Sequence, residues 1–247
     1  GLSKLLNNFI ADAEKGVVSL LAAFYFRQAG HTVDGMQTFE FTHKSFGEFL
    51  TAQRILNHIK LINKRLAKNE ESLEDDGWDI KRCLLEWLKI FGSKELDEDI
   101  IRFIENEIKF VHNKNDAPLL EMQKTTSKLL NHVVNYGMPI ERMAPRLETF
   151  KQENTFAINA EKGLLIIHGS LARFTNQIFN IDWPQDNSFG EFVRRLTGQR
   201  ISAVSQILKY CNHLNLNNCI LHIIDFYEAN LIKTKMALGL IFLLPRI

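Results

Sequence analysis

A single histidine, His43, stands where the sequence changes from a strand pattern to a helix pattern. Phe39 and Phe41 alternate with polar residues as in a half-buried strand, and an amphipathic helix follows. Ser45 and Glu48 have the spacing of a capping box at the start of that helix. Such a junction places an imidazole beside the first free amides of the helix, where anions bind. The sequence thus indicates an anion-contacting histidine, and the alternative is a histidine that is hydrogen-bonded locally.

A second group of residues has the chemistry of metal ligands: Cys211, His213, Cys219 and His222. Four such side chains can close a structural zinc tetrahedron. Their C-x-H-x5-C-x2-H spacing is not a familiar one, and a five-residue pattern described below points Cys219 inward and His222 outward. We therefore interpret the set as a core thiol and surface histidines and predict no metal site.

The other candidates for acid–base chemistry are isolated in the sequence. His112, His132 and His168 fall on helical segments without a carboxylate or nucleophile at a diagnostic spacing, so we interpret them as core or surface residues. The sequence contains no G-x-x-x-x-G-K-[ST] loop and no apolar strand ending in paired acidic residues. These are the parts that bind phosphates and magnesium in an NTPase. We predict that this chain is not an enzyme and that no catalytic residue lies in it.

Composition is that of an ordinary soluble protein. The chain has 247 residues, 45% apolar and 24% charged, enough for one large or two smaller domains. A net charge of +1 argues against nucleic acid as a partner. The longest apolar run, Met236 to Leu244, is short of the roughly 20 residues that cross a bilayer. Three cysteines are too few for a secreted disulfide framework, so we expect a cytoplasmic protein, or a piece of one, without membrane contact.

Most of the sequence has helical periodicity. The helix after His43 has an apolar face that reaches Leu66 and includes Phe46, Phe49, Leu50, Leu56, Ile59 and Ile62. Upstream, two short helices are predicted to end near Gly30. A proline-interrupted connector is predicted at 138–160. Further helices are predicted at 79–91, 96–110, 119–134, 163–179, 189–196 and 202–211.

The helical period fails after Leu214, and a five-residue period replaces it. Apolar residues recur every fifth position, at Leu216, Leu221, Phe226, Leu231, Met236 and Ile241. Small residues stand two positions before several of these centres, at Cys219, Ala229, Thr234 and Gly239. The pattern resembles pentapeptide repeats, which fold as a square right-handed β-helix whose central residues point inward. Leu216, Leu221, Phe226 and Leu231 are the predicted repeat core, and the stretch is long enough only for the first coil.

The segment Phe41-Thr-His43-Lys-Ser45-Phe-Gly-Glu48-Phe-Leu resembles the F-x-H-x-S-F-x-E-F/Y-L-A motif. That motif closes the winged-helix part of NACHT-type STAND NTPases, the class that includes NOD-like receptors and their bacterial relatives. The resemblance implies that His43 contacts the phosphates of bound ADP and holds the closed, inactive state. It also implies that the strand at Phe39 belongs to a winged-helix remnant near residues 36–67.

Two further segments resemble the helical region of bacterial NACHT proteins: Gly77-Trp-Asp…Leu85-Glu-Trp-Leu and Ser188-Phe-Gly-Glu191-Phe-Val-Arg-Arg-Leu. Ser188 and Glu191 again have capping-box spacing. The order of motifs predicts three domains: a winged-helix-like end at 1–67, a helical region at 68–212 and a pentapeptide-repeat β-solenoid start at 213–247. The expected fold class is mainly α, a winged-helix remnant plus helical bundle followed by the first coil of a right-handed β-helix.

The expected function is a non-catalytic regulatory or sensor segment of a STAND signalling NTPase, in bacterial immunity or signal transduction. It would couple a nucleotide switch to a repeat-type recognition domain. No cofactor is expected in this chain, and ATP or ADP is implied only for a full-length parent. The expected partners are an upstream NACHT ATPase module, a protein ligand and further copies of the parent. The alternatives are a stand-alone helical and pentapeptide-repeat interaction module and, with least support, a hydrolase or metal enzyme.

Overall fold

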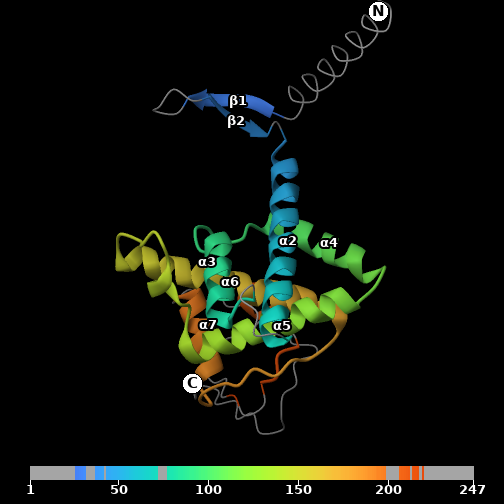
Figure 1. Cartoon of the computed structure of the whole chain (residues 1–247), viewed down its shortest axis with the longest axis vertical. Coiled ribbons are helices and arrows are strands. Elements are labelled where there is room, and N and C mark those ends of the chain that lie inside the picture. The colour runs from blue at the N-terminus through green and yellow to red at the C-terminus, as the bar shows by residue number, and fades with distance from the viewer. Residues whose placement is uncertain are drawn as a thin grey trace, which may run out of the picture. The chain divides into compact units, whose positions relative to one another are not determined.

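The protein is mainly helical, as expected from its periodicity. Its structure is a computed structural model in which the following residues are described: 26–31, 37–41, 43–71, 77–198, 206–211, 213–216 and 219. Figure 1 labels the helices and strands. None of the helices in this described part combines the length and the apolar character that a membrane span requires.

The chain divides into two compact units, Gly1–Thr51 and Ala52–Ile247. The boundary between them falls within helix α2 (Lys44–Glu71). The boundaries expected from the motifs, after residues 67 and 212, stay predictions. Each unit is described separately below.

The first unit contains an antiparallel hairpin of β1 (Phe26–His31) and β2 (Gln37–Phe41). The strand predicted at Phe39 is confirmed, with Phe39 opposite Gln28. The prediction that a helix continues to Gly30 is wrong, because Gly30 lies inside β1 at an irregularity in the register. The unpaired residue is Ala29, and Gly30 beside it pairs with Thr38, so Gly30 continues a strand where we expected it to end a helix.

Helix α2 begins at Lys44, directly after His43, and runs for 28 residues. From Ala52 onward the predicted apolar face of α2 is buried, and Ile59 and Ile62 lie in the core of the second unit. Leu50 belongs to the predicted apolar face but is 39% exposed. The predicted face therefore began too close to the N-terminus of the helix. The C-terminal half of α2 therefore belongs to the helical core.

The second unit is built from the rest of α2 and five further helices among its described residues. The predicted helix at 79–91 is confirmed closely, because Asp79 accepts a hydrogen bond from the Arg82 amide at 2.6 Å and Gly92 ends the helix. The helices are α3 (Ile80–Phe91), α4 (Glu98–His112), α5 (Ala117–Tyr136), α6 (Phe150–Thr175) and α7 (Ser188–Thr197), with a short 3-10 turn η1 (Ile140–Arg142).

Helix α6 is the centre of this unit, since it packs against α3, α4, α5 and α7 (Figure 1). The predicted connector at 138–160 is wrong from Phe150 onward, nearly half of its length, because α6 begins there. Thr149 and Gln152 form a complete capping box there, with the Gln152 amide donating to Thr149 Oγ1 at 3.2 Å and the Thr149 amide donating to Gln152 Oε1 at 3.0 Å. Helix α6 ends at Asn176, which has a left-handed φ of 56°.

The packing of α3 on α6 depends on a buried tryptophan. Trp87 is fully buried, stacks on Phe91 with ring centroids 4.3 Å apart, and donates from Nε1 to the Ala160 carbonyl at 3.0 Å. Asn159 Nδ2 donates to the Gly92 carbonyl at 3.0 Å and fixes the end of α3 on the same helix.

The described residues after α7 do not show a β-helix coil. Residues 206–208 are helical, and Leu214 forms an isolated parallel bridge with Phe179. Leu216 is buried, as the repeat-core prediction requires, although burial alone does not distinguish a solenoid. Leu221, Phe226 and Leu231 lie outside the described residues.

The capping box at Thr149 gives a stability prediction. We expect Thr149→Ala to lower the free energy of unfolding by about 1 kcal/mol, because it leaves an early helix amide without its side-chain acceptor. Thr155→Ala, in the exposed interior of the same helix, is the matched control and should be neutral or slightly stabilising. Urea denaturation of both variants is the measurement, and equal stabilities would contradict a functioning cap.

Candidate functional site

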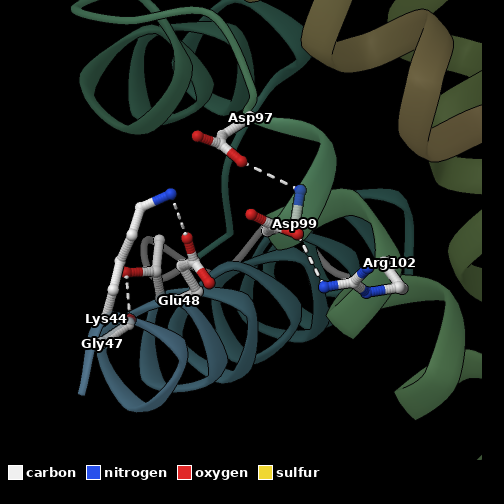
Figure 2. Close-up of polar contacts among 7 residues, drawn as sticks. Lys44, Gly47, Glu48, Asp97, Asp99 and Arg102 are labelled. Carbon is white, nitrogen blue, oxygen red and sulfur yellow. Dashed lines mark hydrogen bonds and ion pairs between the residues drawn. The ribbon is translucent and has the colours of Figure 1, made fainter.

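His43 lies where the sequence placed it, immediately before α2 and after β2, and it is exposed. Its carbonyl accepts a hydrogen bond from the Phe46 amide at 3.1 Å, which closes the first turn. The next residue, Lys44, pairs with Glu48 at 2.8 Å, as Figure 2 shows. The imidazole is therefore presented at a helix start, and the adjacent lysine already has a carboxylate partner.

The two capping boxes predicted at serines are wrong. Ser45 lies inside α2, and Glu48 forms the ion pair with Lys44. Ser188 is the first residue of α7, and its hydroxyl accepts from the Gln185 amide at 2.9 Å, while Asn187 Nδ2 donates to Glu191 at 2.7 Å. A serine cap would lie just before the helix, but α2 already begins at Lys44 and α7 begins at Ser188 itself.

A second candidate site is the place where the chain returns to α6 after α7. We call residues 206–211 and 213–216 with Cys219 the return segment. It approaches α6 at Gly169, where an added Cβ would lie 2.3 Å from the Tyr210 carbonyl oxygen and 2.8 Å from Tyr210 Cα. Only a glycine permits this backbone contact, since real Cβ atoms do not come within 3.0 Å of other heavy atoms.

Polar contacts continue the attachment of the return segment beyond α6. Asn215 Nδ2 donates to Asn180 Oδ1 at 2.7 Å, and Trp183 Nε1 donates to the Asn215 carbonyl at 3.1 Å. His213 Nε2 lies 3.4 Å from Asn176 Oδ1, at the residue that ends α6. Apart from His213, the side chains that the segment buries are mainly apolar: Ile207, Leu208, Tyr210, Cys211, Leu214, Leu216 and Cys219.

Beneath this contact a polar network is buried between α5 and α6. Thr126 Oγ1 donates to the Gln123 carbonyl at 3.0 Å and lies 3.1 Å from His168 Nδ1. The Gln123 side chain accepts from Thr175 and donates to the Gln177 carbonyl at 2.9 Å. Gln123, Thr126 and His168 are fully buried, so the network links α5 and α6 without access to solvent.

The candidate zinc ligands do not come together as a metal site in the described part of the chain. Cys211, His213 and Cys219 form no cluster of ligand atoms there, and His222 lies outside it. Burial raises the pKa of Cys211 to about 12 and that of Cys219 to about 11, so both are protonated thiols at neutral pH. His213 was expected at the surface, and this is wrong, because the residue is buried beside the end of α6.

A cavity of about 350 Å³ opens between α4, α6 and the return segment. Its charges are largely paired: Arg102 with Asp99 at 2.6 Å (Figure 2) and Arg173 with Glu105 at 3.0 Å. Lys209 lies over the Tyr210 ring, 4.9 Å from its centroid. Paired charges of this kind stabilise a surface more readily than they perform acid–base chemistry.

Three further histidines, which we interpreted as core or surface residues, lie at separate places in the helical unit. His112 Nδ1 contacts the Asp116 carboxylate at the end of α4. His132 borders a cavity of about 490 Å³ between α2, α3 and α5, and its pKa is lowered first by burial and then by the charge of Lys81. His168 stands out because it is fully buried.

Sequence reasoning missed the buried partners of α6. Glu161 is almost completely buried, and burial raises its pKa although Arg195 of α7 donates to it from Nε at 2.9 Å. Thr126 and Gln123 belong to a helix that was predicted, yet they looked like ordinary polar positions. Their contacts with α6 join residues more than 40 positions apart, for which the sequence offers no local signal.

No protein-family model matches the chain, and no curated protein or solved structure matches it either.

The backbone contact at Gly169 gives a second stability prediction. We expect Gly169→Ala to destabilise the protein by about 1–2 kcal/mol, because the overpacking cost of about 1–3 kcal/mol exceeds the helix-propensity gain of up to about 1 kcal/mol. The matched control is Gly163→Ala in the same helix, where the new Cβ meets the Phe91 side chain at 2.7 Å.

The Phe91 side chain can shift to make room for the new Cβ, whereas the Tyr210 backbone cannot. Gly163→Ala should therefore lose clearly less stability than Gly169→Ala. Guanidinium denaturation measures both variants. A neutral Gly169→Ala would show that the return segment does not approach α6 this closely.

Proposed function

We propose that the chain is a non-catalytic regulatory segment of a STAND-type signalling NTPase. In this proposal the residues up to about 67 form the end of a winged-helix domain, and His43 contacts a nucleotide held by an upstream ATPase module. The helical region then links this switch to a recognition domain of pentapeptide repeats that begins near residue 213. The parent protein, and not this chain, would bind ATP or ADP and would act in the cytoplasm as an oligomer.

The observation that carries the proposal is the position of His43. β2 ends at Phe41 and α2 begins at Lys44, so His43 is exposed at a strand-to-helix junction, as the F-x-H-x-S-F motif requires. An exposed imidazole at a helix start can donate a hydrogen bond to a phosphate while the nearby amides add partial positive charge. The site is therefore chemically suited to an anion supplied by another domain.

Helix α2 supports the regulatory part of the proposal. It is one uninterrupted helix that starts beside His43, and its later turns bury Ile55, Ile59 and Ile62 in the helical core. Thr125 of α5 donates to Asn63 Oδ1 at 2.6 Å and fixes this part of α2 further. In this proposal α2 would carry a change at His43 to the helical core, because the helix is continuous between them.

A stand-alone interaction module is the second candidate. The observation that favours it is the exposure of two large aromatic side chains on the helical unit, Tyr136 at 79% and Phe150 at 81%. Aromatic residues are enriched at protein interfaces. The genomic locus distinguishes the two candidates, because an upstream phosphate-loop sequence in frame with Gly1 supports the first and its absence supports the second.

The absence of a phosphate loop from the sequence gives a negative prediction. We expect the purified chain neither to hydrolyse ATP nor to bind it tightly, because no loop in the sequence can surround the β- and γ-phosphates. Calorimetry with ATP and magnesium is the measurement. A dissociation constant in the low micromolar range would reveal a nucleotide site of another kind.

The nucleotide role of His43 is tested in a full-length parent. We expect His43→Ala there to favour the open state and to raise basal oligomerisation, because a charge-assisted hydrogen bond contributes about 1.5–3 kcal/mol. That energy shifts a two-state equilibrium by roughly tenfold or more. Light scattering of the ADP-bound parent measures the change, with the exposed neighbour Ser45→Ala as the matched control.

The same substitution in the isolated chain should change the unfolding midpoint very little, because His43 is exposed. If His43→Ala instead unfolds the isolated chain, the residue is structural and the switch role is wrong.

A further inference from the structure

Six charged side chains line the cavity between α4, α6 and the return segment, and four of them neutralise one another. Arg102 pairs with Asp99 at 2.6 Å, as Figure 2 shows. Arg173 pairs with Glu105 at 3.0 Å, and Ser170 Oγ also donates to Glu105 at 3.3 Å. These four charges therefore already have partners in the protein, and they fix α4 on α6 beside the cavity.

The other two charges are Glu98, at the start of α4, and Lys209, on the return segment. Neither side chain makes an ion pair within the part of the chain that the structure describes. They line the same cavity without pairing with each other, so the cavity keeps two opposite charges apart. Lys209 Nζ lies 4.9 Å from the centroid of the Tyr210 ring, a weaker contact than a hydrogen bond to a carboxylate.

The same cavity has an apolar side. Ile101 and Tyr210 line it and are buried. The backbone of Tyr210 lies against α6 at Gly169, which fixes this wall in position. The volume of about 350 Å³ is near the lower end of the range of ~300–1,000 Å³ for small-molecule sites. The cavity thus combines an apolar surface for one small ligand with two separated, opposite charges.

We propose that this cavity binds a free α-amino acid with an apolar side chain. The carboxylate of the amino acid accepts from Lys209, and its ammonium group donates to Glu98. The apolar side chain packs on Ile101 and Tyr210. Such a ligand joins α4 to the return segment, and its binding is independent of the nucleotide role proposed for His43.

The two unpaired charges explain why the ligand is a zwitterion. A simple anion gains Lys209 but leaves Glu98 beside a like charge, and a simple cation does the reverse. An α-amino acid carries both charges next to each other and satisfies both residues. Each charge-assisted hydrogen bond is among the stronger contacts in proteins, so the loss of either should weaken binding about tenfold or more.

The binding test uses calorimetry on the full chain with L-alanine, L-valine, L-leucine and L-phenylalanine. We expect at least one of them to bind with a dissociation constant below about 1 mM. Two analogues of the tightest ligand each lack one charge. For leucine, isoamylamine lacks the carboxylate and isocaproate lacks the ammonium group. Each analogue should bind about tenfold more weakly or worse.

Two variants remove one unpaired charge each. Lys209→Met and Glu98→Gln keep most of the side-chain shape, and we expect about tenfold weaker binding of the amino acid to each. Lys109→Met on α4 and Glu121→Gln on α5 are the matched controls, because both residues are exposed and do not line the cavity. The controls should bind like the unchanged protein. Circular dichroism checks that every variant is folded.

Lysine acetylation tests the location of the ligand without any substitution. Mass spectrometry would measure the acetylation of Lys209 relative to that of Lys109. At about ten times its dissociation constant, the amino acid should lower this ratio about tenfold. The proposal is overturned if none of the four amino acids binds, or if a singly charged analogue binds as tightly. An unchanged acetylation ratio overturns it as well, since the ligand then binds elsewhere.

Discussion

The helical unit depends on one constraint: α6 packs against four other helices, so the polar groups that it buries need partners inside the protein. The structure meets this constraint with a different contact for each neighbour. The Ala160 carbonyl receives Trp87 of α3, Glu161 pairs with Arg195 of α7, and Ser170 bonds Glu105 of α4. His168 and Thr175 both bond residues of α5. These contacts specify which face of α6 each neighbour covers, which apolar packing alone does less selectively.

The two glycines of α6 add a steric condition to this polar one. At Gly163 the ring of Phe91 occupies the space of a side chain, and at Gly169 the backbone of Tyr210 does so. Glycine inside a helix is unfavourable by itself, by about 1 kcal/mol relative to alanine. Their presence in a central helix is therefore explained by the close approach of neighbours and not by local structure. The same helix consequently carries the polar and the steric requirements of the whole unit.

The sequence predicts the parts of this fold that have local causes. Helix α3 could be placed almost to the residue, because Asp79 and Gly92 flank a clean apolar stripe. We did not predict the start of α6, because Pro139 and Pro145 indicated a connector there. The spacing of Thr149 and Gln152 is nevertheless that of a capping box. Ser45 and Glu48 have the same spacing as Thr149 and Gln152 but form no capping box. At the candidate sites, the exposed His43 could be located from the strand-to-helix change. The buried His168 and His213 make their contacts across 42 and 37 residues, which leave no pattern in the sequence.

The return segment joins the helical unit through a backbone contact, apolar burial and a few hydrogen bonds. Tyr210 packs on Gly169 of α6, and Leu208, Leu214 and Leu216 are buried in the core. Apolar burial contributes in proportion to the area covered, and it is tolerant of where each side chain lies. The contact at Gly169 and the hydrogen bonds of Asn215 with the loop after α6 instead require particular groups at particular positions. These few contacts therefore specify where the segment lies on the helical unit, while the leucines supply most of the burial.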